Sequence, residues 1–505
     1  MKRTRAFFRL RGAAVLVALA LGTGLARAEG EPAFHLGGYV RLGASVNLQD
    51  APETAANDRG KLSMLRGTLL LDADAEAGPL RFKGVARGVR EYKTDYLRDL
   101  EKRVKATTPG GPGSDMMDTL YDEGELRELH VEFEPTDRIQ VRLGKQQVVW
   151  GETDFFRAMD VVHGFDYRWR AFLEPENEEL RKPLILANMT VQVPEADGAL
   201  QLLFRPGWDR KEDIGNTIDL AGGRWRPQPY RGSDTLSATR YDARHPAGDV
   251  RDKTWGVRWA GRGGAVNYSL AYLKTYNPDP VLNSAFVPYK KAPEGLLGDW
   301  INPQNDVFGA TVSGYLQSID AVLSTELVYT KGAAFNVGSQ SMWPGVLPEG
   351  LGGIVRRDTF TSMFRMDKNL DLRNVLGTSK LSMFSVQFFN TRILDFDKAD
   401  DIVMNVGYPT RRKHDSALLT ALLAMSYDGD RINPQLAAGW DVSYGGGFLI
   451  PSVDIVMGDH WRLKVEADLF FGGNPRRPGD LDGSTSTMGY FRDNNQLYLR
   501  LTRQF

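Results

Sequence analysis

Short segments in which apolar and polar residues alternate one by one recur along most of the chain. In the last segment, Leu497, Leu499 and Leu501 alternate with polar residues, and the chain ends at Phe505. Because successive side chains of a β-strand point to opposite faces, each segment predicts a strand with one apolar and one polar face. We expect about eighteen such strands, at residues 36–48, 65–76, 80–92, 128–134, 139–143, 184–193, 199–206, 253–261, 265–274, 305–317, 319–330, 357–367, 378–390, 417–427, 432–443, 447–457, 461–471 and 494–505.

The connections between these segments have two lengths. Short turns such as Gly78-Pro79 and Pro135-Thr136-Asp137 alternate strictly with long polar loops at 93–124, 150–182, 207–251, 275–304, 331–356, 391–415 and 472–492. Short periplasmic turns and long extracellular loops are typical of a membrane β-barrel, whereas a soluble sandwich would not alternate its connection lengths. A sheet in lipid must also close, because unpaired backbone groups are costly there. The sequence therefore predicts an all-β fold, a transmembrane antiparallel barrel of about 16 to 18 strands.

The N-terminal residues predict export. Lys2, Arg3 and Arg5 precede an apolar run at 13–25, and Ala26-Arg27-Ala28 has the small-residue pattern of a cleavage site. We therefore expect a signal peptide at 1–28 and a barrel at 29–505, placed in the outer membrane of a Gram-negative bacterium. The last strand ends in an aromatic residue, Phe505, and so resembles the C-terminal signal that the barrel-assembly machinery recognises. We therefore expect that machinery as a partner, together with the lipids of the outer membrane.

Composition excludes several classes of function. The chain has no cysteine, and 63 basic residues nearly balance 64 acidic ones, which argues against a nucleic-acid binder. No later stretch approaches the length of an apolar transmembrane helix. Neither Gly-x-Ser-x-Gly nor His-Glu-x-x-His occurs, and His130 stands among glutamates with no serine nearby. We therefore expect no enzyme activity, no cofactor and no metal site.

Charges of both signs occupy the polar faces of the predicted strands. A charged residue that faces lipid at mid-membrane costs about 2–4 kcal/mol for Arg or Lys, so these side chains should point into the lumen. They allow two interpretations: a salt-bridge network that stiffens the wall, or a transverse field that selects solutes. The residues of this predicted lumen charge ladder are Arg81, Lys83, Glu128, His130 and Glu132.

The alternation fails at Gly144, where its strict continuation would point Lys145 and Gln147 into lipid. We expect a glycine bulge to shift the phase there. The loop that follows, at about 150–182, is too apolar and aromatic for a purely aqueous position, so we predict that it folds into the lumen. The candidate constriction and binding residues are Arg142, Gln146, Trp150, Glu152, Asp154, Phe155, Arg157, Asp160, Asp166 and Arg168.

The run Arg142-Leu143-Gly144-Lys145-Gln146, followed by Trp150-Gly151-Glu152, resembles a proteobacterial outer-membrane barrel family. That family is catalogued only as a domain of unknown function, number 1302. Asp367-Lys368-Asn369-Leu370 and the segment 491–499 also match it. Two departures occur: His163-Gly164 replaces a common Asn-Pro, and Lys145 stands where Arg is commoner.

The resemblance implies a barrel that moves hydrophobic or amphipathic molecules. It also implies a periplasmic lipoprotein or an inner-membrane exporter of the resistance-nodulation-division type as a possible partner. No phosphate-binding loop or N-terminal plug is visible, so transport would be passive or driven by such a partner. The alternatives are a general diffusion porin and a structural or interaction barrel whose loops bind partners.

Overall fold

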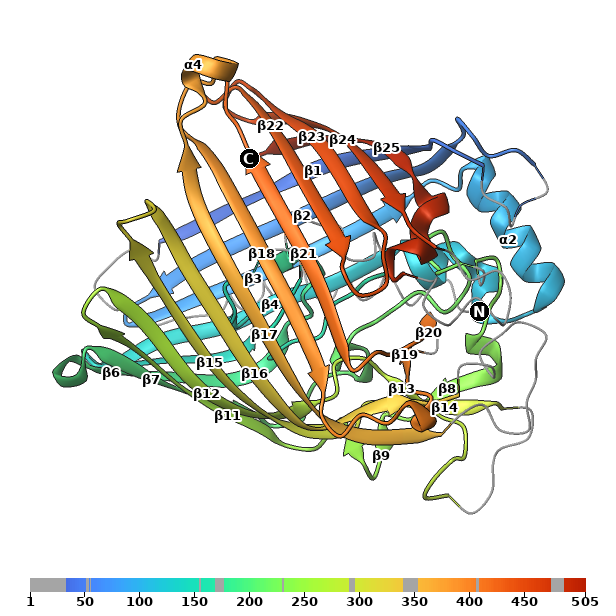
Figure 1. Ribbon diagram of the computed structural model, residues 1–505, viewed down its shortest axis with the longest axis horizontal. Helices are drawn as coiled ribbons and strands as arrows, with labels where there is room; N and C mark the ends of the chain where they lie inside the picture. Colours follow the sequence, from blue (N-terminus) through green and yellow to red (C-terminus); the bar gives the residue numbers. More distant parts are fainter. Residues whose placement is uncertain are drawn as a thin grey trace.

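The computed structural model describes residues 33–505 except 51–53, 55, 154–155, 169–176, 229–230, 290–295, 339–352, 406–407 and 474–485. The predicted signal peptide lies outside the described residues. Eighteen antiparallel strands form one closed sheet (Figure 1). They are β1(Phe34–Asn47), β2(Leu62–Ala77), β3(Leu80–Glu91), β4(Glu123–Thr136), β5(Ile139–Gln146), β6(Leu184–Val193), β7(Gly198–Arg205), β11(Thr254–Gly263), β12(Val266–Tyr276), β15(Gln304–Leu316), β16(Ala321–Asn336), β17(Ile354–Leu370), β18(Ser382–Ile393), β21(Asp415–Ala424), β22(Ile432–Asp441), β23(Gly447–Met457), β24(Trp461–Phe471) and β25(Gln496–Gln504).

The first and last strands close the barrel. Leu42 of β1 pairs with Gly67 of β2 on one side and with Leu501 of β25 on the other. At the end of the seam, the main-chain groups of Gly38 and Phe505 exchange two hydrogen bonds of 3.1 Å. The predicted closure of an all-β barrel by its C-terminal strand is confirmed, and every predicted strand has a counterpart.

The smaller elements lie in the connections. They are α2(Asp95–Thr107), α3(Asn177–Leu180), α4(Arg373–Leu376), β8(Thr239–Tyr241), β9(Arg244–His245), β10(Gly248–Asp249), β13(Val281–Asn283), β14(Gly298–Ile301), β19(Val403–Asn405), β20(Tyr408–Arg411), η1(Pro112–Asp115), η2(Met117–Tyr121), η3(Pro194–Ala196), η4(Lys211–Asp213), η5(Leu236–Ala238), η7(Lys398–Asp400) and η9(Met488–Asn494). In the described part of the chain, none of the helices has the length and apolarity to cross a membrane.

The prediction that short and long connections alternate strictly was wrong at one position on each rim. On the long-loop rim, β22 and β23 are joined by only residues 442–446, where Gly445 and Gly446 take φ values of 73° and 91°. On the short-turn rim, residues 371–381 form a longer connection that contains α4. The two glycines permit the left-handed backbone of the tight turn.

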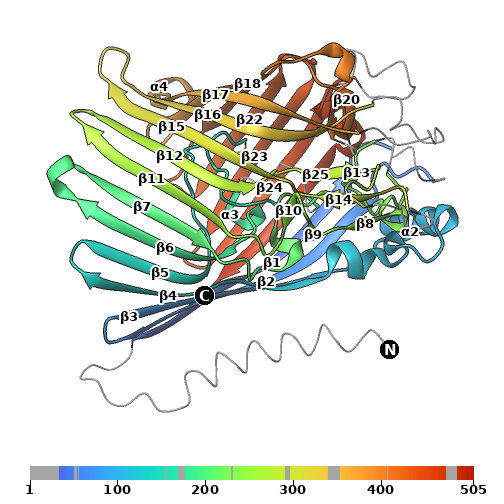
Figure 2. The same ribbon diagram turned by 90° about the horizontal axis from the view of Figure 1, so that it is seen from below.

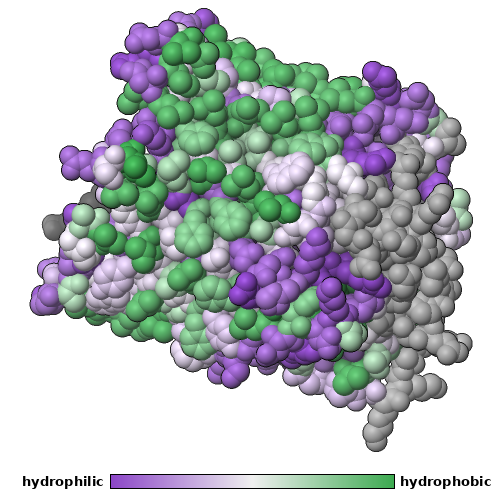
Figure 3. Space-filling model, in the orientation of Figure 1, coloured by the Kyte–Doolittle hydropathy of each residue, from purple (hydrophilic) through white to green (hydrophobic). Residues whose placement is uncertain are grey.

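The outer wall carries the apolar face of the strands. Figure 3 shows hydrophobic residues over much of the wall that faces the viewer. Towards the long-loop rim, four outward rings follow one another on adjacent strands, with centroid distances of 4.8, 5.1 and 6.1 Å from Trp255 through Tyr272 and Phe308 to Tyr329. At the opposite rim, the guanidinium of Arg503 lies 5.9 Å from the ring of Trp461, which accounts for a cation on the apolar face of β25.

Long connections fill the interior and cover one rim. α2 packs four buried side chains, Tyr96, Leu97, Leu100 and Val104, against other loop residues, and it lies at the long-loop end of the barrel (Figure 1). α3 lies inside the barrel (Figure 2), where Glu179 accepts hydrogen bonds from Arg41 of β1 at 2.9 Å. The segment that positions the candidate site connects β5 to β6. We call residues 147–183 the inward loop.

Candidate functional site

Two glycines of the wall receive anchor side chains of the inward loop. Trp150 is buried, and its indole N–H donates to Oε1 of Gln201 on β7 at 2.8 Å. A Cβ at Gly256 of β11 would lie 2.8 Å from Cη2 of Trp150, and a Cβ at Gly309 of β15 would lie 2.0 Å from Sδ of Met159. Each glycine therefore makes a socket that any larger residue would close.

A buried carboxylate on β16 holds the tip of the loop. Glu326 is fully buried, and its carboxylate accepts hydrogen bonds from the main-chain N–H of Glu152 at 2.5 Å and of Met159 at 2.7 Å. The residues that flank these two points also approach closely, because a Cβ at Gly151 would lie 2.8 Å from the main-chain nitrogen of Asp160. The Trp-Gly-Glu run thus supplies an anchor, a close backbone approach and a clasped main chain.

Two arginines organise the interior of the loop. The guanidinium of Arg157 lies 3.7 Å from the ring centroid of Phe165 and donates to the hydroxyl of Tyr167 at 3.0 Å. Arg181 donates to the carboxylate of Asp160 at 2.6 Å, and both side chains are buried. This ion pair offsets part of the cost of removing the carboxylate from water.

His163 joins the two ends of the loop as a neutral ring. Its Nε2 accepts from the main-chain N–H of Val148 at 2.9 Å, which leaves Nδ1 to donate to the carbonyl of Lys182 at 3.0 Å. Burial lowers the pKa of His163 to about 4 and that of Lys182 to about 8. The next residue, Gly164, approaches Gly215 so closely that a Cβ would lie 1.8 Å from its carbonyl oxygen. The pair His163-Gly164 is therefore adapted to this contact.

The loop and the wall share one apolar core. Its loop members are Val148, Trp150, Ala158, Met159 and Val162. They pack on buried side chains of seven barrel strands: Leu184, Leu186, Leu203, Leu273, Val307, Val328, Met363 and Phe389. Burial of these apolar side chains away from water provides the main stabilisation of the docked loop.

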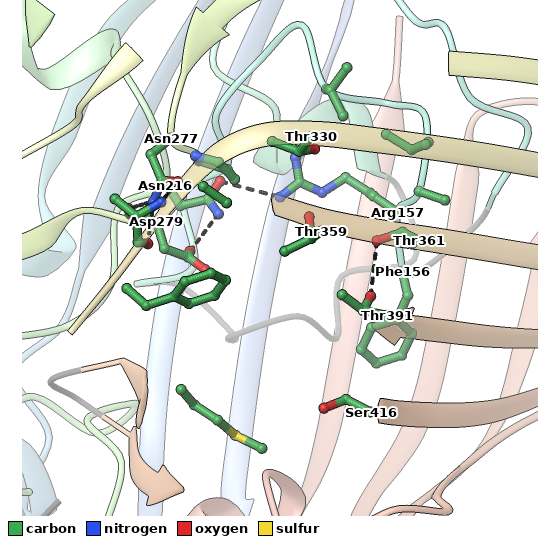
Figure 4. Close-up of a pocket in the computed structure, with 18 of the residues that line it drawn as sticks. Phe156, Arg157, Asn216, Asn277, Asp279, Thr330, Thr359, Thr361, Thr391 and Ser416 are labelled. Carbon is green, nitrogen blue, oxygen red and sulfur yellow. Dashed lines mark hydrogen bonds between the residues drawn. The ribbon is translucent and has the colours of Figure 1, made fainter. Parts of the chain in front are cut away.

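A cavity lies on each side of the loop. The upper cavity, towards the long-loop rim, has a volume of about 530 Å³ and is bordered by Phe156, Arg157 and Asp160 of the loop (Figure 4). The lower cavity, towards the short turns, has about 480 Å³ and is bordered by Glu152 and Arg258.

The predicted constriction residues do not form a single site. Trp150, Glu152, Arg157 and Asp160 belong to the anchored loop, whereas Gln146 is buried in the wall and accepts from Asn188 at 3.2 Å. Arg142 pairs with Glu132 at 2.7 Å in the wall. Asp166 and Arg168 bind each other, 2.5 Å apart, where the loop pairs with Thr217. Asp154 and Phe155 lie outside the described residues.

The structure places the predicted charge ladder on β3 and β4. Arg81 lies 3.7 Å from Glu132, and His130 lies 3.5 Å from Glu128. Lys83 contacts Asp72 at 2.5 Å and Asp74 at 3.0 Å across the β2–β3 pair. One member reaches the inward loop, because Glu128 accepts a hydrogen bond from Gln147 at 3.1 Å.

The bulge predicted at Gly144 was wrong. β5 keeps its register through this residue, which pairs with His130 on one side and Leu186 on the other. The glycine instead takes φ 129°, and a Cβ would lie 2.3 Å from the carbonyl oxygen of Leu129. Lys145 stands at the end of the strand, so it reaches Asp213 of a long loop, 3.4 Å away, without a change of phase.

The sequence did not single out Glu326, Gly256 or Gly309. Gly256 and Gly309 lie within predicted strands, where an isolated glycine indicates a close approach by another group. Glu326 had no distinguishing feature, because an acid on a lumen face is common in any barrel.

The fold and interior together define a closed β-barrel with an anchored internal loop between two cavities. A family model described as "Protein of unknown function (DUF1302)" matches residues 9–505, so the chain belongs to that family and the predicted resemblance is confirmed. A search of curated proteins finds no match.

Three solved structures illustrate the level of structural similarity. OccAB1 of Acinetobacter baumannii is 10% identical, with 94% of this chain and 96% of that chain covered and a TM-score of 0.46. OpdK of Pseudomonas aeruginosa, solved with vanillate, is 8% identical over 94% and 98%, with a TM-score of 0.43. The outer membrane channel DcaP of Acinetobacter baumannii is 8% identical over 96% and 100%, with a TM-score of 0.38. Such low similarities indicate nothing about a substrate.

Proposed function

We propose that this protein is an outer-membrane channel for a hydrophobic or amphipathic small molecule, with the inward loop as its constriction. The observation that carries the proposal is the apolar core between loop and wall, which separates the upper from the lower cavity. The apolar outer wall and its row of aromatic rings support a position in a bilayer, where aromatic girdles mark the interfaces.

Passage through the barrel requires the loop to move. The anchors Trp150 and Met159 sit in glycine sockets, and Glu326 clasps the main chain between them. Displacing this tip would join the two cavities into one path. Glu152 and Arg258 border the lower cavity with opposite charges and would bias the orientation of a polar solute.

Two alternatives make different predictions. A general diffusion porin needs a lumen open to water, which the apolar loop–wall core disfavours. A structural barrel whose long loops bind partners would not conduct even without its inward loop. We also propose that a signal peptide exports the chain and that the barrel-assembly machinery inserts it among outer-membrane lipids. A periplasmic lipoprotein or an inner-membrane exporter would drive transport.

Single-channel recording in planar bilayers tests the proposal. We expect low conductance from the wild type and large, steady conductance when residues 152–162 are replaced by a Gly-Ser linker of equal length. A wild type that already conducts as fully as the linker variant would favour a diffusion porin. Silence of both proteins, each shown to be inserted, would favour a structural barrel.

A further inference from the structure

A row of hydroxyl groups crosses neighbouring strands on the wall of the upper cavity. Thr330 of β16 pairs with Thr359 of β17. Thr361 of β17 pairs with Thr391 of β18, which pairs with Ser416 of β21. All five residues line the cavity, and Figure 4 shows them together on one side of it. Adjacent strands are about 4.8 Å apart, so the hydroxyls form a regular polar stripe.

Most of this stripe has no protein partner. Thr361 and Thr391 share a hydrogen bond of 3.0 Å. Within the described residues, the hydroxyls of Thr330, Thr359 and Ser416 make no bond to a protein group. Asn305 of β15 also lines the cavity, and neither polar atom of its amide has a partner although the residue is only 5% exposed. The three hydroxyls line the cavity and are open to a ligand. The amide of Asn305 is a buried unpaired polar group, which is rare in proteins.

The surfaces around the stripe are apolar. Phe156 and Val161 of the inward loop, Met488 of η9 and Ile218 border the same cavity. The ring of Phe156 lies 6.2 Å from that of Phe389 on the wall, so it is held in place. This combination of an apolar enclosure and a few polar groups is typical of a small-molecule site, and about 530 Å³ is within the usual range.

Charges of both signs border the cavity. Arg157 and Arg412 are balanced by Asp279 and Asp441, while Asp160 is neutralised by Arg181 at 2.6 Å. The upper cavity therefore has no clear preference for one sign of charge, which favours an uncharged ligand.

We propose that the upper cavity binds an uncharged amphipathic molecule of drug-like size, with an apolar body and hydroxyl or carbonyl groups along one edge. The apolar body packs on Phe156, and the polar edge bonds to Thr330, Thr359 and Ser416. This inference rests on the proposed channel function, since the bound molecule would be a solute in transit.

The test compares two flat probes, a trihydroxyflavone and unsubstituted flavone, which share a ring system and differ only in hydroxyl groups. Equilibrium binding is measured on the full chain in detergent micelles. The test variant T330V/T359V/S416A removes three hydroxyls with little change in volume. The matched control is Thr420→Val, a buried substitution on β21 outside the cavity lining. Circular dichroism and gel mobility check that each variant is folded.

We expect the triple variant to bind the trihydroxyflavone at least about 10-fold more weakly, because three hydrogen bonds to the ligand are lost. Its affinity for flavone should change less than about twofold, and the control should match the wild type. An equal loss for both probes, no loss for either, or an equal loss in the control would overturn the proposal. If the triple variant does not fold, the single variants T359V and S416A replace it, each with a loss of about threefold.

The result is independent of conductance. Probe binding in micelles needs no passage through the barrel, so a silent channel in bilayers would leave a hydroxyl-dependent affinity intact. A conducting linker variant together with unchanged probe affinity would overturn this site alone.

Discussion

Glu326 of β16 accepts a hydrogen bond from the main-chain N–H of Met159 at 2.7 Å, and the same carboxylate binds Glu152 on the other side of the loop tip. One wall residue thus holds two points of the inward loop that are seven residues apart in sequence. This relationship makes the loop a separately anchored element of the barrel.

Glu326→Gln should loosen the loop tip. The amide keeps one acceptor oxygen, whereas its NH₂ group faces a main-chain N–H that it cannot bind. Losing a hydrogen bond to a charged group costs about 1.5–3 kcal/mol, so channel openings should become about 10- to 100-fold more frequent. Opening frequency in planar bilayers is the measurement. Glu132→Gln, which alters the wall ladder away from the loop anchors, serves as control. Equal opening frequencies in both variants would contradict the role of Glu326.

How much of this the sequence could predict depends on the range of the interactions. The alternation in 184–193, 447–457 and 461–471 predicts β6, β23 and β24 with the bounds that the structure has, because each residue faces either lipid or lumen. The inward position of the loop also followed from its composition. The wall residue that binds the loop tip could not be predicted. Glu326 is 174 positions from Glu152 and 167 positions from Met159 in sequence. The prediction of a bulge at Gly144 was wrong, because a glycine with a positive φ and an inserted residue look alike in sequence.

Gly256→Ala should displace Trp150 from its socket. The added Cβ would lie 2.8 Å from Cη2 of Trp150 and 2.7 Å from Cδ1 of Leu273, so at least one side chain must move. Overpacking of this kind costs about 1–3 kcal/mol. We expect faster proteolysis within 147–183 and a lower thermal unfolding midpoint than in the wild type. Gly88→Ala on β3 is the matched control, because no atom lies within 4 Å of the position of its Cβ. Identical proteolysis rates for the two alanine variants would refute the socket.

Acid should release the loop through His163. Its pKa is about 4 in the folded protein and about 6.5 in an unfolded chain. The neutral ring is therefore favoured by folding, and its stabilisation is complete above pH 6.5 and is lost as the pH falls towards about 4. The shift corresponds to roughly 3 kcal/mol. Protonation also puts a proton on Nε2, which then cannot accept from Val148.

The corresponding measurement is the opening frequency in bilayers at about pH 7 and about pH 4.5. Carboxylates titrate over part of this range, so the readout is the difference between the wild type and His163→Asn. We expect the acid-induced increase to be markedly smaller in that variant. His414→Asn, at an exposed site on a long loop, should keep the full increase. A response that His163→Asn leaves unchanged would assign the effect to other groups.

Asp160→Ala should lower the stability of the protein more than the simultaneous replacement of Asp160 and Arg181. Alone, the change leaves the guanidinium of Arg181 buried without the carboxylate that it contacts at 2.6 Å. Breaking a buried pair on one side costs about 3–5 kcal/mol, whereas an apolar replacement of both partners is often nearly neutral. We therefore expect Asp160→Ala to lower the thermal midpoint strongly and to expose the loop to protease. The double variant D160A/R181M should recover most of both losses. Additive losses in this double-mutant cycle would show that the two side chains act independently.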